Sequence, residues 1–203
     1  MTDTPEFPAT SFIDLSKSGF RGLVNSGSTC YLNSFLQTLF MTPDFREAVY
    51  KWSPTKSVVA AQSLPLQLQK LFARLQLSDM GAVPTEALTT SFGWTRSDLF
   101  QQHDVQEFIQ KLYEMIEQVA AGSTLAKTLR ELNYGSVVDY VQCKKCNTFR
   151  GHDTPFLNLA LDITGCSNLR QSFETYVKPD VLEGSNAVLC AHCKSKQAST
   201  KGF

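Results

Sequence analysis

Apolar residues recur at helical spacing along the first part of the chain, up to about Ala121. After a polar loop that contains Gly27, the apolar positions follow i, i+3, i+4, i+7 spacing, which predicts a helix with one buried face. These positions are Leu32, Phe35, Leu36, Leu39 and Phe40. Ser28 or Thr29 can cap this helix, which places Cys30 in its first turn.

Three more helices follow from the same reasoning, at residues 42–52, 63–77 and 104–120. The first two begin with a threonine or serine cap and an early proline, which is typical of helix starts. The third has the clearest apolar stripe, made of Val105, Phe108, Ile109, Leu112, Ile116 and Val119. Asp104 and Glu107 have the spacing of a capping box at its start.

After Gly122 the pattern changes to that of strands. Residues 136–142 are rich in valine and tyrosine, and residues 156–163 alternate polar and apolar positions, so both are predicted strands. A short helix is expected over residues 167–177, with Leu169, Phe173, Tyr176 and Val177 facing inward. Helices followed by strands predict an α+β fold with two lobes.

The predicted organisation is a flexible lead-in over residues 1–19 and one domain over residues 20–203. Within that domain, a helical lobe covers residues 20–122 and a β-rich portion covers residues 123–203. The 203 residues are 42% apolar and 19% charged, which is typical of a folded protein, and formal net charge is zero. We therefore expect neither a nucleic-acid nor a membrane partner. No secretory signal is recognisable at the start, which favours a cytoplasmic or nuclear location and reduced cysteines.

Cys30 is the first candidate for chemistry. A helix N-terminus stabilises a thiolate through its unpaired N–H groups and its dipole. Asn25 in the preceding loop, together with the Cys30 backbone N–H, would stabilise the oxyanion of an acyl-transfer intermediate. The alternative is a buried, inert cysteine at the start of a core helix.

The stretch "GLVNSGSTCYLNSFLQTLF", residues 22–40, closely resembles the cysteine box of the ubiquitin-specific protease family of deubiquitinases. "QQHDVQEF", residues 101–108, resembles a second box of this family. The residues from Tyr134 through "CKKC" and "FLNLALDI" to "CAHC" resemble its fingers region. The resemblance implies a papain-like cysteine protease fold with a helical thumb and β-rich fingers. It also implies ubiquitin and ubiquitinated proteins as partners, Cys30 as nucleophile and Asn25 in the oxyanion hole.

Asp104 and Gln101, both in the second box, are candidate substrate-binding residues. Their place at a helix N-terminus lets polar groups point into a cleft while Phe108 anchors the core side. By resemblance, this region borders the groove that holds the extended tail of ubiquitin. The alternative for Asp104 is that it only caps the helix.

Two CxxC pairs predict a structural zinc site with four ligands, Cys143, Cys146, Cys190 and Cys193. Each short turn presents two thiolates to one ion, which suits tetrahedral zinc. The alternative is four reduced cysteines left by a zinc site that has decayed. His192 lies inside the second pair, and Cys166 lies outside both pairs.

The sequence offers three histidines, His103, His152 and His192, as a base for Cys30. None matches the catalytic histidine of the family, which lies in a Gly-His-Tyr type motif near the C-terminal end of the domain with an Asp or Asn partner after it. We therefore expect that the palm and the histidine box are missing, and that these residues alone are poorly stable and weak or inactive. A non-catalytic ubiquitin-binding or regulatory fragment is the alternative function, and a zinc-ribbon scaffold is a third.

Overall fold

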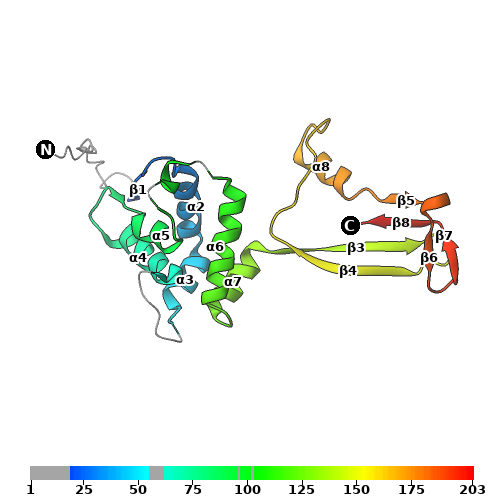
Figure 1. The fold of residues 1–203 in the computed structure, drawn as a ribbon, viewed down its shortest axis with the longest axis horizontal. Helices are drawn as coiled ribbons and strands as arrows, with labels where there is room; N and C mark the ends of the chain where they lie inside the picture. The colour runs from blue at the N-terminus through cyan, green and yellow to red at the C-terminus, as the bar shows by residue number, and fades with distance from the viewer. Residues whose placement is uncertain (1–18, 55–61, 96, 102) are drawn as a thin grey trace. The chain divides into compact units, whose positions relative to one another are not determined.

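The computed structural model describes residues 19–54, 62–95, 97–101 and 103–203. The chain divides into two compact units: the first ends at Leu132, and the second runs from Asn133 to Phe203. The first unit is mainly helical and the second mainly stranded (Figure 1). This mixture confirms the predicted α+β class. The predicted boundary after Gly122 stays a prediction, and the predicted lead-in lies outside the described residues except for Gly19.

Among the described residues, six α-helices lie before the boundary or reach it. Their bounds are α2 Cys30–Met41, α3 Pro43–Lys51, α4 Leu64–Leu77, α5 Glu86–Ser91, α6 Val105–Val119 and α7 Thr124–Asn133. A 3-10 turn, η2, covers Asp98–Phe100. The four helices predicted from the apolar spacing are therefore confirmed as α2, α3, α4 and α6. No helix in the described part of the chain is long and apolar enough to cross a lipid bilayer.

The hydrophobic core of the first unit lies between these helices. Its fully buried members include Leu32 and Leu36 of α2, Phe72 of α4, and Leu112 and Ile116 of α6. Burying one such side chain contributes about 1.5–3 kcal/mol relative to leaving it exposed. This packing makes α2, the helix that begins at Cys30, a rigid part of the core.

A short parallel strand pair holds the chain just before the cysteine loop. Strand β1, Gly22–Leu23, pairs with β2, Ala82–Val83, and the Val24 N–H continues the ladder to the Val83 carbonyl at 3.0 Å. The Gln37 side chain of α2 donates a hydrogen bond to the Arg21 carbonyl at 2.9 Å. The chain therefore enters the cysteine loop from a fixed position.

The second unit contains a four-stranded antiparallel sheet in the order β4-β3-β8-β5. The strands are β3 Gly135–Cys143, β4 Phe149–Phe156, β5 Asp180–Leu182 and β8 Ser199–Gly202. A separate antiparallel pair is formed by β6, Val188–Cys190, and β7, Ser195–Gln197. The helix α8, Leu169–Tyr176, and the 3-10 turn η3, Gly184–Asn186, complete the unit. The strand predicted over residues 136–142 is confirmed as β3.

The strand predicted over residues 156–163 is wrong. Only Phe156 belongs to a strand, as the last residue of β4, and it pairs with Gly135 at the start of β3. The residues before Gly135 form the helix α7, so the partner strand ends there and offers no backbone groups to residues 157–163. Ile163 accordingly remains 78% exposed. Alternation of apolar residues is not enough for a strand without a neighbouring ladder.

Two other features differ from the expectation. Helix α8 forms as predicted, but Leu169, Phe173 and Val177 are exposed rather than inward-facing. Of the four residues expected inward, only Tyr176 is half-buried, and it stacks on Phe203 with ring centroids 5.1 Å apart. The helix α7 was missed, although the apolar spacing of its sequence, with Leu125 and Leu129 buried, is helical.

Candidate active site and metal centre

Cys30 is the first residue of α2, and its side chain is exposed. The three buried leucines of α2 begin at Leu32, so the helix turns its apolar face to the core while its first residue stays accessible. The first N–H groups of a helix have no partner within the helix, and a group at this position lies beside them. The expectation that Cys30 lies in the first turn is confirmed, and the alternative of a buried cysteine is wrong.

Asn25 and Thr29 are joined by a hydrogen bond across the loop before Cys30. The Thr29 hydroxyl donates to the Asn25 side-chain oxygen at 3.0 Å, and it accepts from the Ser26 backbone N–H at 3.1 Å. Thr29 is the N-cap residue of α2, but its side chain makes no cap hydrogen bond to the helix. The predicted cap is therefore correct in position, while its hydroxyl serves the loop instead.

The same loop is held against the turn η2. The Ser28 N–H donates to the Leu99 carbonyl at 2.8 Å, and the Ser28 hydroxyl donates to the Phe100 carbonyl at 3.2 Å. Gly27 has φ +128°, and a Cβ there would lie 2.8 Å from the Leu99 oxygen. Because only glycine avoids both the strained φ and this contact, Gly27 allows the loop and η2 to meet. At the other end, the Asn33 side chain donates to the Val24 carbonyl at 3.1 Å.

Asp104 is the N-cap of α6, as predicted. One carboxylate oxygen accepts the Gln106 backbone N–H at 2.7 Å. This is a bond to the second helical residue, whereas the capping-box spacing predicts a bond to the third, Glu107. Asp104 and Gln101 are both exposed at the helix start.

An aromatic cluster lies between η2 and α6. The His103 and Trp94 rings stack with centroids 5.1 Å apart, and the His103 Nε2 atom is 3.3 Å from the Asp98 carbonyl oxygen. Together with Glu107 and Lys111 these residues line a pocket of about 310 Å³. Hydrogen bonds from Thr95 lower the pKa of the Asp98 carboxyl at the edge of the pocket.

Tyr31, the residue after Cys30, faces the same cluster. Its ring meets the Phe108 ring edge-on at 5.8 Å and the His103 ring at 6.4 Å. Burial raises the pKa of the Tyr31 hydroxyl, while a backbone interaction with His103 opposes the shift. Within the described part of the first unit, no histidine nitrogen is hydrogen-bonded to Cys30. His152 and His192 belong to the second unit, where both are exposed.

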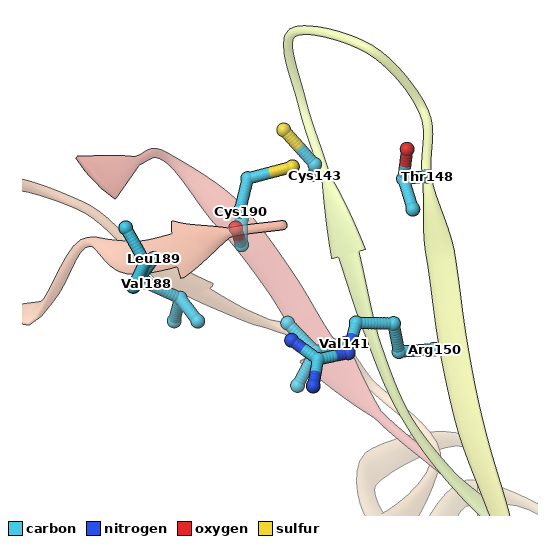
Figure 2. Close-up of a pocket in the computed structure, with 8 residues that line it drawn as sticks. Val141, Cys143, Thr148, Arg150, Val188, Leu189 and Cys190 are labelled. Carbon is cyan, nitrogen blue, oxygen red and sulfur yellow. The ribbon is translucent and has the colours of Figure 1, made fainter. Parts of the chain in front are cut away.

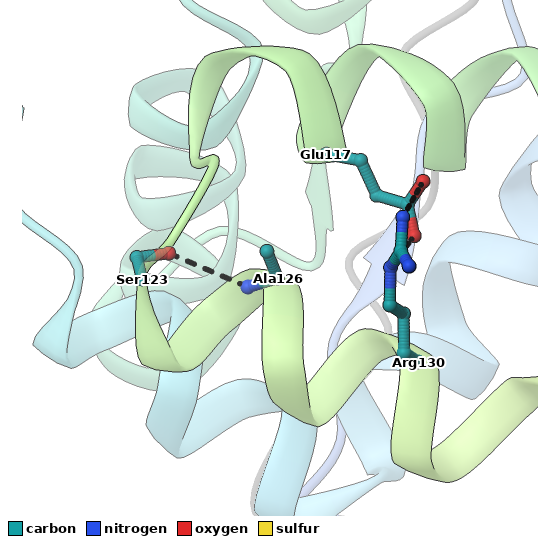
Figure 3. Close-up of polar contacts among 4 residues, drawn as sticks. All are labelled: Glu117, Ser123, Ala126 and Arg130. Carbon is teal, nitrogen blue, oxygen red and sulfur yellow. Dashed lines mark hydrogen bonds and ion pairs between the residues drawn. The ribbon is translucent and has the colours of Figure 1, made fainter.

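The helices α6 and α7 are joined by an ion pair. The Arg130 guanidinium lies 2.7 Å from the Glu117 carboxylate, and the Ser123 hydroxyl accepts the Ala126 N–H at 3.4 Å at the start of α7 (Figure 3). Since the Glu117 side chain is only 19% exposed, this pair is better shielded from water than the other ion pairs of the described residues.

The two CxxC pairs form turns of the same geometry. In the first, the Asn147 N–H donates to the Cys143 carbonyl at 2.9 Å, and in the second, the Lys194 N–H donates to the Cys190 carbonyl at 2.9 Å. Asn147 and Lys194 both have φ +56°. Two matched turns therefore present two cysteines each from opposite segments, β3–β4 and β6–β7.

The four predicted cysteine ligands come together in the second unit. Their sulfurs all lie within 4.8 Å of one another, and the Cys146 and Cys190 sulfurs are 3.5 Å apart. A hydrogen bond with Thr148, at 3.1 Å, lowers the pKa of the Cys146 thiol to about 5, while the bond with the Cys146 sulfur raises the pKa of the Cys193 thiol to about 12. Ionisation of one thiol therefore opposes that of its neighbour. A cation would relieve this conflict, so the cluster suits a metal.

A mainly apolar pocket of about 300 Å³ lies beside this cluster. Cys143 and Cys190 lie at one end of it, with Thr148 nearby, and Val141 and Arg150 lie at the other (Figure 2). Cys143 and Cys190 are both buried. The burial of these two residues partly shields the cluster from water.

The sequence model of the family "Ubiquitin carboxyl-terminal hydrolase" matches residues 21–196, which is most of the chain. The chain belongs to the ubiquitin carboxyl-terminal hydrolase family. The matched range includes the cysteine loop, the start of α6 and both CxxC turns.

Individual relatives in this family are similar over most of the chain. Ubiquitin carboxyl-terminal hydrolase 47 of Drosophila melanogaster is 39% identical over 195 residues, 93% of this chain and 12% of the relative. The human protein of that name is 38% identical over 201 residues, 96% of this chain and 15% of the relative. Ubiquitin C-terminal hydrolase 12 of Arabidopsis thaliana is 41% identical over 176 residues, 87% of this chain and 16% of the relative. The chain therefore spans about an eighth to a sixth of these hydrolases.

Sequence reasoning missed two contributors to these sites. Thr29 was considered only as a helix cap, and Thr148 was not considered. The Thr29 contact to Asn25 depends on the loop doubling back on itself, and local apolar spacing carries no signal for that. For Thr148, its place two residues after Cys146 was the available signal.

Proposed function

We propose that this member of the hydrolase family carries the nucleophile of a deubiquitinase at Cys30. The observation that supports this most strongly is the pairing of an exposed cysteine at the first residue of α2 with a fixed amide at Asn25. An accessible thiol and an oriented hydrogen-bond donor are the two groups that acyl transfer needs on this side of the substrate.

In the proposed reaction, the Cys30 sulfur attacks the carbonyl carbon of the C-terminal glycine of ubiquitin. The carbonyl oxygen becomes an oxyanion, which accepts hydrogen bonds from the Asn25 side-chain NH₂ and the Cys30 backbone N–H. A base takes the proton of the Cys30 thiol during attack and gives it to the leaving nitrogen. Collapse of the intermediate then breaks the peptide or isopeptide bond and releases the amine, leaving a thioester on Cys30. Water then hydrolyses the thioester and frees ubiquitin.

The start of α6 is the proposed site for the ubiquitin tail. One oxygen of Asp104 accepts the Gln106 N–H, so the carboxylate keeps lone pairs for a backbone N–H of an extended peptide. Gln101 is exposed and would add an amide to the same contact. Capping and substrate binding are thus compatible roles for Asp104.

The general base is proposed to be none of the three histidines of this sequence. His103 is stacked on Trp94 with its Nε2 atom near the Asp98 carbonyl oxygen. We infer that the base and its orienting partner are supplied from outside these residues, and that the residues alone turn over ubiquitin conjugates weakly or not at all.

The ion proposed for the four-cysteine cluster is structural zinc, held by Cys143, Cys146, Cys190 and Cys193. Zinc–sulfur bonds of about 2.3 Å in a tetrahedron place the sulfurs about 3.8 Å apart. The observed sulfurs, all within 4.8 Å and one pair at 3.5 Å, need only small shifts to reach this arrangement. Four thiolates leave no open position, so the ion would stabilise the fold and take no part in the reaction.

Hydrolysis of a ubiquitin-based fluorogenic substrate tests the proposal. The full natural polypeptide that contains this sequence is expected to turn the substrate over, and Cys30→Ala should abolish turnover. Cys166→Ala serves as the matched control, because Cys166 lies outside both sites, and it should leave the rate unchanged. Binding of ubiquitin without any turnover would favour the non-catalytic alternative instead. His103→Ala should retain turnover, and its complete loss would assign the base to His103.

A further inference from the structure

Thr29 makes contacts that a helix-capping threonine does not make. The residue is only 1% exposed, although it directly precedes the exposed Cys30. A threonine at this position ordinarily accepts an N–H of the first helical turn. Here the hydroxyl makes no such bond and is turned back toward the loop. Its two partners are both in that loop, at Asn25 and Ser26.

The chemistry of the two partners fixes the direction of each hydrogen bond. A backbone N–H only donates, so the Thr29 oxygen accepts from Ser26. The single hydroxyl proton is then free to be donated to the Asn25 side-chain oxygen. With its oxygen bound in this way, the Asn25 amide is held with the NH₂ group at the opposite end.

The orientation of the Asn25 amide decides what it does to an oxyanion. With its NH₂ group toward the oxyanion, the amide donates a hydrogen bond. With its oxygen toward the oxyanion, it repels the negative charge. Asn25 is exposed, and among the described residues its side-chain oxygen is held by the hydrogen bond from Thr29. The Thr29 hydroxyl is therefore the contact that selects the donating orientation.

Besides the Ser26 bond to Thr29, the loop is held by contacts that do not involve the Thr29 hydroxyl. Ser28 is bonded to the carbonyls of Leu99 and Phe100, and Asn33 is bonded to the Val24 carbonyl. Removal of the hydroxyl should therefore release the Asn25 amide while these contacts keep the loop in place.

We propose that Thr29 is a positioning residue, which presents the Asn25 NH₂ group to the oxyanion formed during attack by Cys30. This inference rests on the proposed function, because it takes the Asn25 amide to be an oxyanion donor. Thr29 itself does not touch the substrate in this account. Its effect on the rate passes entirely through Asn25.

The kinetic test uses the full natural polypeptide and a ubiquitin-based fluorogenic substrate. Thr29→Val keeps the shape and removes the hydroxyl, and it should lower kcat about tenfold with little change in KM, the scale of one net hydrogen bond. Thr29→Ser keeps the hydroxyl and should restore most of that rate. Thr38→Val is the matched control, because the Thr38 hydroxyl bonds only the Ser34 carbonyl on the exposed side of the same helix, and it should leave kcat unchanged.

A double variant separates positioning from general stability. Asn25→Ala should lower kcat by about 10²–10³-fold, as expected for loss of an oxyanion donor. Adding Thr29→Val to Asn25→Ala should then cause no further loss. If Thr29→Val lowers kcat by the same factor with and without Asn25, or if Thr29→Ser is as slow as Thr29→Val, the inference is overturned. If Asn25→Ala retains the full rate, the oxyanion assignment of the proposed function fails instead.

Nuclear magnetic resonance of the full natural polypeptide, with its asparagine side chains labelled, gives an answer that does not depend on turnover. The order parameter of the Asn25 side-chain nitrogen should be about 0.8 in the unchanged chain and in Thr29→Ser, and it should fall below about 0.6 in Thr29→Val. An Asn25 side chain that is equally ordered in all three proteins would overturn the positioning role, whatever the kinetics show.

Discussion

Removal of metal from the second unit should unfold that unit and leave the first unit folded. The structure describes all of residues 133–203, and the buried ones among them are Cys143, Ser172, Cys190, Ser199 and Gly202. No large apolar side chain is among them, whereas the first unit has many. A small unit without such a core needs another source of stability, and two of its buried residues are predicted metal ligands.

The size of the effect follows from the binding equilibrium. At a free zinc concentration 1,000 times the dissociation constant, bound metal adds about 4.1 kcal/mol to the free energy of unfolding. Fully burying one leucine contributes about 1.5–3 kcal/mol, so the metal would equal about two core leucines in a unit that has none fully buried. Loss of about 4.1 kcal/mol raises the equilibrium constant for unfolding about 1,000-fold.

Hydrogen exchange followed by mass spectrometry, with zinc or with a chelator, measures this for each element separately. Peptides from β3 and β8 should exchange up to about 1,000-fold faster with the chelator, because the four-stranded sheet opens. Peptides from α4 and α6 should not change, since their core lies in the first unit. The metal content of the untreated protein should be about one zinc per chain.

Matched serine variants complete the experiment. Cys190→Ser removes a ligand and should reproduce the effect of the chelator, while Cys166→Ser should behave as the unchanged protein. Equal exchange in β3 with and without the chelator, in a protein shown to contain zinc, would refute the argument that metal stabilises the second unit. Absence of zinc from protein purified with zinc present would refute the site itself.

Three further predictions concern the first unit, whose urea unfolding can be followed by tryptophan fluorescence because both tryptophans lie there. Gly27→Ala should destabilise the cysteine loop and slow labelling of Cys30, because the added Cβ would lie 2.8 Å from a backbone oxygen at φ +128°. Gly93→Ala, at φ +78° with open space around it, is the control and should leave labelling unchanged. Phe72→Ala should lower the free energy of unfolding by about 3–5 kcal/mol, because the Phe72 side chain is fully buried. Leu77 is 75% exposed, so Leu77→Ala should change the free energy of unfolding by no more than about 0.5 kcal/mol. Asp104→Ala should lower it by about 1 kcal/mol through loss of the cap, and Asp104→Asn should retain most of the stability; equal losses in both would contradict the cap.

The helices of the first unit could be predicted because their signals are local. In α2 and α4, apolar residues at helical spacing lie next to a cap residue or an early proline, and the structure places both helices where this pattern indicates. The same spacing in α7 was overlooked, although Leu125 and Leu129 are buried as it implies.

The errors concern features that depend on distant parts of the chain. Residues 157–163 alternate like a strand, but β3 ends its ladder opposite Phe156, and no local pattern shows that. Helix α8 is amphipathic, yet Leu169 and Phe173 are exposed. Their burial was wrongly predicted because amphipathic spacing does not show whether a partner surface exists.

In the candidate sites too, features with a local sequence signal were predicted, and features set by distant parts of the chain were not. The spacing of the two CxxC pairs predicts that the cysteines meet, and the structure brings the four sulfurs together. Cys30 is also placed as predicted, at the start of α2. The bond from Thr29 to Asn25 and the approach of Gly27 to Leu99 arise from the folded path of the loop and from a segment far along the chain, so no sequence pattern indicates them.

Covalent labelling with a ubiquitin probe that carries an electrophile at its C-terminus tests the central claim most directly. The full natural polypeptide is predicted to form one stable adduct, which peptide mapping should place on Cys30 and which Cys30→Ala should abolish. Because the probe reacts only where ubiquitin binds with its tail next to a nucleophile, an adduct supports both the thiol and the substrate. A folded protein with Cys30 intact that forms no adduct, or forms it on another cysteine, would contradict the account.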